Sequence, residues 1–242
     1  MKKKILFIID ALCAGGAEKS LITILNLLDY DIYDVDLFLL RHEGEFLSMI
    51  PKEVNLLKED EKYKIFSKNR KISFIKYMLK LDFKSAYYSF LWNIGVLRSR
   101  IRKEKLYIGW KYINKLIRPL EKEYDTSVAF LERKSIYFNV DKVRAKNKIG
   151  FIHNDYDKYP FDYELDKKYF YYLDNIATVS DHCKDVLIKI FPEYEDKYIV
   201  IRNIVLKKMI LELAQEKIEN YNIREDIINI VSVRKINISK RF

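Results

Sequence analysis

Cysteine, glycine and proline are all scarce in this chain of 242 residues. Its two cysteines form no Cys-x-x-Cys pair, which excludes a disulfide scaffold and a zinc ribbon and fits a reducing compartment. Six glycines and four prolines leave no collagen-like tract and no loose linker. Hydrophobic residues make up 49% of the chain, which is enough for a packed core and excludes wholesale disorder.

Long apolar runs are also missing. The chain starts with a basic stretch like that of a signal peptide, but the apolar run at residues 5–9 ends at Asp10. A signal peptide needs about 7–15 apolar residues and a membrane span about 20. The short run is typical of a buried strand, so we expect a cytoplasmic protein. Any contact with a membrane would then be peripheral, on its inner face.

Strand-like apolar runs alternate with helical spacing along most of the chain. Continuous apolar runs are typical of strands covered on both faces of a parallel sheet. The alternation predicts an α/β fold, a Rossmann-like parallel sheet with helices on both faces. The predicted strands are residues 5–9, 35–40, 54–57, 126–131, 148–152, 175–179, 197–201 and 228–233, and the predicted helices are residues 17–28, 163–173, 181–191 and 205–221.

The net positive charge of the protein comes entirely from one segment, residues 62–122. It holds 17 Lys and Arg against 3 Asp and Glu, a net charge of +14, whereas the formal charge of the full chain is +10. Its pattern is helical and interleaved with Phe, Tyr and Trp. It therefore reads as a basic helical segment inserted into the α/β rhythm.

Three interpretations of this segment remain open. Scattered charge usually marks a solvated helical face. A basic surface with Trp and Tyr also suits the anionic inner surface of a membrane, where each Lys or Arg gains roughly 1 kcal/mol. Nucleic acid is a third partner for a basic surface, but the sequence carries no motif for binding it. We favour the membrane surface and expect no nucleic acid.

Several segments resemble bacterial glycosyltransferase family 4, whose members are retaining, nucleotide-sugar-dependent enzymes of the GT-B fold. The resemblance lies in the order of the segments as well as in their residues. It is carried by residues 5–9 with 15–21 (ILFII and GGAEKSL), 124–130 (YDTSVAF), 148–156 (KIGFIHNDY), 174–180 (DNIATVS) and 197–204 (KYIVIRNI).

The resemblance implies that residues 1–204 are the N-terminal, acceptor-binding Rossmann-like domain. Residues 205–242 would be a linker helix and the start of the donor-binding domain. It also implies transfer of a sugar from a nucleotide-sugar to a saccharide or lipid-linked acceptor in cell-surface polysaccharide biosynthesis. The nucleotide-sugar is a substrate, so no cofactor is expected, and no metal is expected in such an enzyme.

The last residues resemble the first strand of the donor domain but depart from it. Arg234 and Arg241 stand where the family usually has glycine. Lys235 and Lys240 resemble the pair that binds the donor diphosphate, and we take them as vestigial because the rest of that domain is missing. We expect a truncated enzyme, or one half of a split enzyme whose donor domain is a separate chain. The alternative is a non-catalytic module that binds a membrane or a partner.

His153 is the candidate catalytic residue. It follows the predicted strand 148–152, and parallel sheets place their ligands at the carboxyl ends of strands. Histidine suits proton transfer near neutral pH. The resemblance implies that it lines the acceptor pocket, where Asp155 would orient it or bind a hydroxyl. The alternative is a surface histidine with local hydrogen bonds, and His42 and His182 are taken as structural.

The remaining candidate binding residues lie at the N-termini of predicted helices. Gly15 and Gly16 either let a phosphate approach the helix N-terminus or simply form a tight turn. Glu18 lies in the first turn, where a carboxylate stabilises the helix, and a substrate role is its second interpretation. Ser180 is most simply an N-cap, with substrate binding as the alternative.

Overall fold

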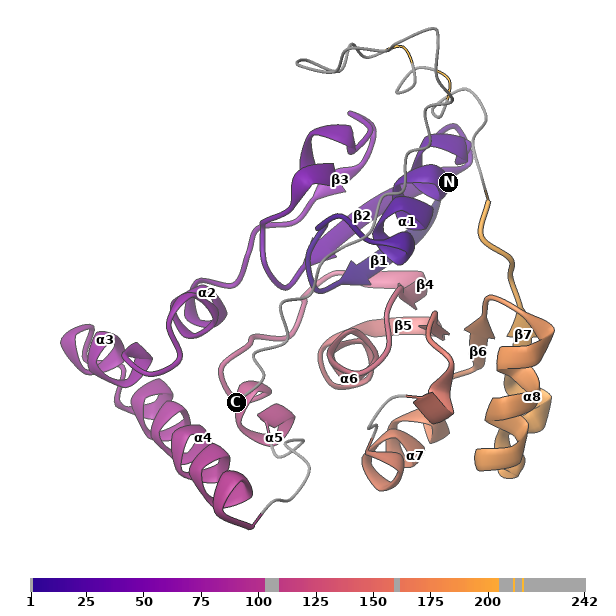
Figure 1. The fold of residues 1–242 in the computed structure, drawn as a ribbon. Coiled ribbons are helices and arrows are strands. Elements are labelled where there is room, and N and C mark those ends of the chain that lie inside the picture. Colours follow the sequence, from indigo (N-terminus) through magenta and orange to yellow (C-terminus); the bar gives the residue numbers. More distant parts are fainter. Residues whose placement is uncertain (1, 103–108, 159–161, 205–210, 212–214, 216–242) are drawn as a thin grey trace, which may run out of the picture. The chain divides into compact units, whose positions relative to one another are not determined.

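The structure is a computed structural model that describes residues 2–102, 109–158, 162–204, 211 and 215. The chain divides into two compact units, residues 1–205 and 206–242. The first unit, shown in Figure 1, contains every strand described below. The predicted strand 228–233, Lys235, Lys240 and all but two residues of the predicted helix 205–221 lie outside the described residues.

The first unit is built on one parallel sheet of seven strands in the order β3-β2-β1-β4-β5-β6-β7. Strand β1 pairs with β2 on one side and with the central strand β4 on the other, where Ile5 lies opposite Thr126. The strands are β1 (Lys3–Ile9), β2 (Tyr33–Leu39), β3 (Asn55–Leu56), β4 (Glu123–Ala129), β5 (Arg144–Ile152), β6 (Asn175–Thr178) and β7 (Tyr198–Val200).

Helices cover both faces of this sheet (Figure 1). On one face, Leu21, Ile22 and Leu25 of α1 pack against apolar side chains of β1 and β2. On the other face the core is formed with all the remaining α-helices of this unit. The α-helices are α1 (Gly16–Leu27), α2 (Glu61–Lys68), α3 (Ser73–Leu79), α4 (Phe83–Arg102), α5 (Gly109–Ile113), α6 (Lys134–Lys142), α7 (Tyr163–Tyr171) and α8 (Asp181–Ile190).

The strand order reverses direction between β1 and β4. From β1 the chain moves outward through β2 to β3, and it then returns to build β4 to β7 on the other side. In open parallel sheets the ligand crevice lies outside the carboxyl ends of the strands at such a reversal. The predicted α/β fold with a Rossmann-like parallel sheet is confirmed. Its reversal places the expected ligand site at the loops that follow β1 and β4.

Most predicted elements match observed ones to within a few residues, but α6 was not predicted. Its residues Ser135 to Asn139 are all buried. The helix has only nine residues, fewer than the roughly 11–18 over which helical spacing is normally recognised, so the sequence pattern did not reveal it. The weak strand predicted at residues 54–57 is only two residues long, Asn55–Leu56.

Between β3 and β4 the chain forms the four helices α2 to α5. Helices α3 and α4 are joined by a short turn and touch through two buried serines, Ser73 and Ser89, whose hydroxyl oxygens are 2.5 Å apart. Among the residues described, no helix combines the length and the apolar character needed to cross a bilayer.

Candidate functional site

Five strands deliver polar residues to the same edge of the sheet. Because all strands are parallel, the residues that follow them gather at one side. Asp10 follows β1, Arg41 lies two residues beyond β2, and Glu132 three residues beyond β4. His153 directly follows β5, and Ser180 lies two residues beyond β6. This edge is the candidate site.

Asp10 lies at the reversal point and is held by two cations. Its carboxylate oxygen Oδ2 is 2.9 Å from the Arg41 guanidinium and 3.6 Å from the Lys134 amine. The other oxygen, Oδ1, is buried without a hydrogen-bond partner. Burial lowers the pKa of Lys134, with repulsion from Arg41 adding to this and Asp10 opposing it. The cluster therefore holds a carboxylate whose charge is largely balanced but whose hydrogen-bonding capacity is not filled.

A hollow of about 380 Å³ lies beside this cluster, at the start of α6. Its wall includes Ser135, which is only 1% exposed and whose hydroxyl has no hydrogen-bond partner. No side chain caps the first turn of α6. The lining residues are Asp10, Leu131, Glu132, Arg133, Lys134, Ser135 and Asn154.

His153 is held by aromatic neighbours and by one hydrogen bond. Its ring stacks on Phe151 at 4.4 Å between centroids and lies 5.0 Å from Phe130. Burial lowers the pKa of His153 to about 4, although a hydrogen bond to the Phe130 carbonyl opposes this. Nε2 is buried without a partner, so Nδ1 makes that bond. At neutral pH the imidazole is uncharged, and Nε2 offers a lone pair rather than a proton.

Glu132 fixes the loop that carries His153. Its carboxylate accepts a 3.3 Å hydrogen bond from the His153 backbone N–H and another from the side-chain amide of Asn154. Both bonds connect the loop after β4 to the loop after β5. Glu132 therefore positions the two residues of the candidate site that follow β5.

Asp155 lies close to His153 in sequence, but its contacts face elsewhere. Its carboxylate is paired with Lys158 and lies 3.4 Å from Nε2 of His182. The Lys158 amine is the main cause that lowers the pKa of Asp155. Its second oxygen, Oδ1, is buried without a partner. The structure thus gives His182 a contact with a candidate residue that its sequence context did not indicate.

The two glycines after β1 form the start of α1. Neither has a positive φ, and a methyl group on Gly16 would meet no atom within 4 Å. A Cβ on Gly15 would lie 2.2 Å from Oε2 of Glu18, so the Glu18 carboxylate folds back over the first turn. Burial raises the pKa of Glu18, and Glu132 and Asp10 raise it further while a bond to its own backbone N–H lowers it. Glu18 therefore occupies the helix end that a phosphate was expected to approach.

Ser180 is the N-cap of α8. Its hydroxyl accepts a 3.1 Å hydrogen bond from the Cys183 backbone N–H. This is the simpler of the two interpretations that the sequence left open.

Sequence reasoning missed five residues of this edge: Asp10, Arg41, Glu132, Lys134 and Ser135. The available signal was position, because each lies within a few residues of the end of a predicted strand. Their pairing could not be foreseen, since Arg41 and Lys134 meet Asp10 across 31 and 124 residues of sequence. Within the described residues, no three His, Cys, Asp or Glu side chains are grouped as a metal site.

Comparison with known proteins places no further constraint on this site. No protein-family model matches the chain, and no curated protein matches it.

Proposed function

We propose that residues 1–204 are the acceptor-binding domain of a retaining glycosyltransferase of family 4 type. The proposal rests on the resemblance of five segments and on the position of the hollow at the reversal between β1 and β4. The reaction would transfer a sugar from a nucleotide-sugar to a saccharide or lipid-linked acceptor.

The observation that carries the proposal is the chemistry of the unfilled hydrogen-bonding atoms. Asp10 and Ser135 line the hollow, where Asp10 Oδ1 is an acceptor and the Ser135 hydroxyl can donate or accept. His153 precedes the lining residue Asn154, and its Nε2 is a further acceptor. Buried polar atoms are normally paired, so a ligand that completes them must bring donors. A phosphate dianion has no proton to donate, whereas a saccharide presents several hydroxyl groups. The hollow therefore suits the hydroxyl-rich acceptor better than it suits a bare anion.

Each residue has a distinct role in this proposal. Asp10 accepts from one acceptor hydroxyl, and Arg41 and Lys134 hold its carboxylate in place. His153 accepts from the hydroxyl that attacks the donor sugar, and Glu132 keeps its loop in register. With its pKa lowered to about 4, His153 orients this hydroxyl rather than carrying a proton at neutral pH.

Saccharide binding by the full chain tests the proposal. A titration with monosaccharides and disaccharides, followed by amide NMR shifts, should perturb residues 10, 132–135 and 153–154. Asp10→Asn and His153→Ala should weaken binding at least about tenfold, the scale of one lost hydrogen bond to a charged or buried group. Asp125→Asn, at the opposite edge of the sheet, is the control. Shifts confined to other surfaces, or no saccharide binding, would contradict the assignment.

Sugar transfer is measured separately. The full chain is assayed with UDP- and GDP-sugars together with the saccharides that bind. Release of nucleotide that depends on the acceptor and is lost in His153→Ala would show transfer by this chain. Saccharide binding without release would restrict the chain to the acceptor side of the reaction.

A further inference from the structure

Helix α4 buries several small residues and exposes several large apolar ones. It buries Ser85, Ala86 and Ser89, each no more than 1% exposed. It exposes Phe83 (62%) and Tyr87 (58%) to solvent. Surface helices normally bury the large apolar side chains and expose the polar ones. The outer side of α4 is therefore built to contact something other than water.

The same character continues over α3 and the turn between the two helices. We define the α3–α4 face as the exposed apolar and aromatic side chains of residues 72–97. On α4 they follow helical spacing, since Phe83, Tyr87, Phe90 and Leu97 lie at i, i+4, i+7 and i+14. Six members are more than half exposed: Ile75 (55%), Leu79 (81%), Leu81 (75%), Phe83 (62%), Tyr87 (58%) and Leu97 (59%).

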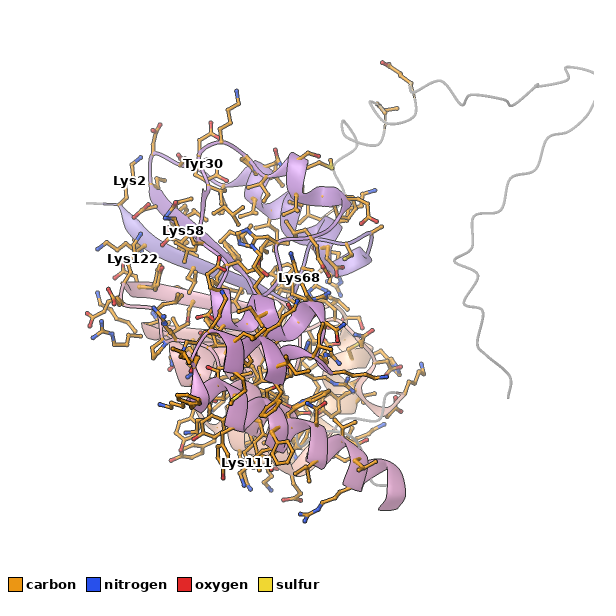
Figure 2. All side chains as sticks on the ribbon, turned by 90° about the vertical axis from the view of Figure 1, so that its left-hand side faces the viewer. Lys2, Tyr30, Lys58, Lys68, Lys111 and Lys122 are labelled. Atoms are coloured by element: carbon orange, nitrogen blue, oxygen red, sulfur yellow. The ribbon has the colours of Figure 1, made fainter. Side chains whose placement is uncertain are left out.

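The charge around this face has one sign. Residues 68–98 contain seven Lys and Arg, all exposed, and one acid, Asp82. Asp82 is already engaged, at 2.6 Å from the Lys62 amine and 2.8 Å from the Ser85 hydroxyl. Figure 2 looks onto the side of the molecule that carries these helices, and the labelled Lys68 and Lys111 lie on it. Apolar side chains are thus bordered by cations without competing acids.

We propose that the α3–α4 face docks on an anionic lipid bilayer. Its apolar side chains would enter the interface between headgroups and acyl chains, and the lysines would contact the anionic headgroups. A second copy of this chain would bring seven further cations against the first seven, which is unfavourable. Nucleic acid would match the charge but would leave Leu79 and Leu81 exposed to water. Of these three occupants, only the bilayer satisfies both the apolar and the cationic parts of the face.

The proposal does not depend on glycosyl transfer, and its test uses no sugar. The full chain is sedimented with vesicles of phosphatidylcholine, with or without phosphatidylglycerol. We expect binding to the anionic vesicles that weakens with salt. Leu79→Ser with Phe83→Ser should weaken it at least about tenfold, because the most exposed apolar contacts are lost. Lys76→Gln, Lys80→Gln and Lys84→Gln together should weaken it about a hundredfold.

Matched variants keep the test specific. Tyr171→Ser with Tyr172→Ser removes side chains of similar exposure from the end of α7, and it should leave vesicle binding unchanged. Lys52→Gln, Lys168→Gln and Lys189→Gln remove three exposed charges elsewhere. Circular dichroism shows that each variant is folded.

Three results would overturn the proposal. One is the absence of binding to anionic vesicles. Another is an equal loss of binding in the control variants. The third is a dimer in sedimentation velocity that Leu79→Ser with Phe83→Ser dissociates, because the face would then belong to a second copy.

Discussion

The Tyr124 hydroxyl donates a 2.6 Å hydrogen bond to the carboxylate of Asp36, which has no exposed surface. Asp36 also accepts from Asn55 at 2.9 Å and from the Lys122 amine at 3.2 Å. These contacts tie β2 to β3 and, across β1, to β4. A charge in the middle of a buried strand is tolerated here because three donors surround it.

Tyr124→Phe should lower the free energy of unfolding by about 1–3 kcal/mol, the cost of removing a donor from a buried acceptor. Urea denaturation followed by circular dichroism measures it. Tyr172→Phe, at a residue 62% exposed, is the control and should change stability little. Equal stability of the two variants would mean that Lys122 and Asn55 suffice for Asp36.

Gly44→Ala, in the loop after β2, should lower the free energy of unfolding by more than about 1 kcal/mol, because a side chain at this backbone conformation is strained. Gly44 has a φ of +122°, and a Cβ would lie 2.1 Å from the backbone of Leu12. Gly16→Ala meets open space and is the matched control, with a change of less than about 1 kcal/mol. Thermal unfolding compares the two, and a larger loss at Gly16 would contradict the geometry of this loop.

Asp166 should make stability fall as pH rises toward neutrality. It is buried with Tyr137 and Tyr156 donating to it, and burial raises its pKa to about 6 from an ordinary 3.8. The folded protein therefore binds the proton more tightly than the unfolded chain does. This contribution is complete below pH 3.8 and is lost as pH rises through about 6, a change of about 3 kcal/mol.

Asp166→Asn isolates this contribution. Unfolding free energies of both proteins are measured across that window, and the difference between them should vary with pH. The difference should favour the variant more at pH values above 6 than below 4. Parallel curves for the two proteins would show that Asp166 does not titrate in this range.

Glu132→Ala should release the loop that carries His153. Without the carboxylate, the His153 and Asn154 donors lose their partner, so the His153 amide should exchange at least about tenfold faster. The imidazole should also titrate above its present pKa of about 4, because a looser loop is better solvated. Hydrogen exchange and ring NMR measure both effects. Glu123→Ala, whose side chain is 72% exposed, should change neither.

The sheet could be predicted because its strands are short apolar runs that need no partner to be recognised. Residues 5–9 and 148–152 are typical of strands buried on both faces, and both are strands in the structure. The order of the strands could not be read in the same way. That β1 pairs with β4 depends on contacts between residues more than 100 positions apart.

The candidate site was predictable only in part. His153 was found because it directly follows a strand, and its place at the carboxyl edge agrees with that prediction. The low pKa of His153 was not foreseen, since it arises from burial against Phe130 and Phe151. The sequence indicated a basic, aromatic-rich helical segment at residues 62–122, but which side chains of α4 are exposed could not be read from it.

The reversal between β1 and β4 also has a consequence for how the protein folds. β1 and β2 are separated by a single helix, so they can pair early in folding. β1 can pair with β4, where Ile5 lies opposite Thr126, only after the long intervening segment has closed into a loop. Closing so long a loop is slow and comes after local contacts. The seam between β1 and β4 is therefore expected to be among the last parts of the sheet to assemble. Because Asp10 and Lys134 lie on the two sides of that seam, their pairing reports completion of folding.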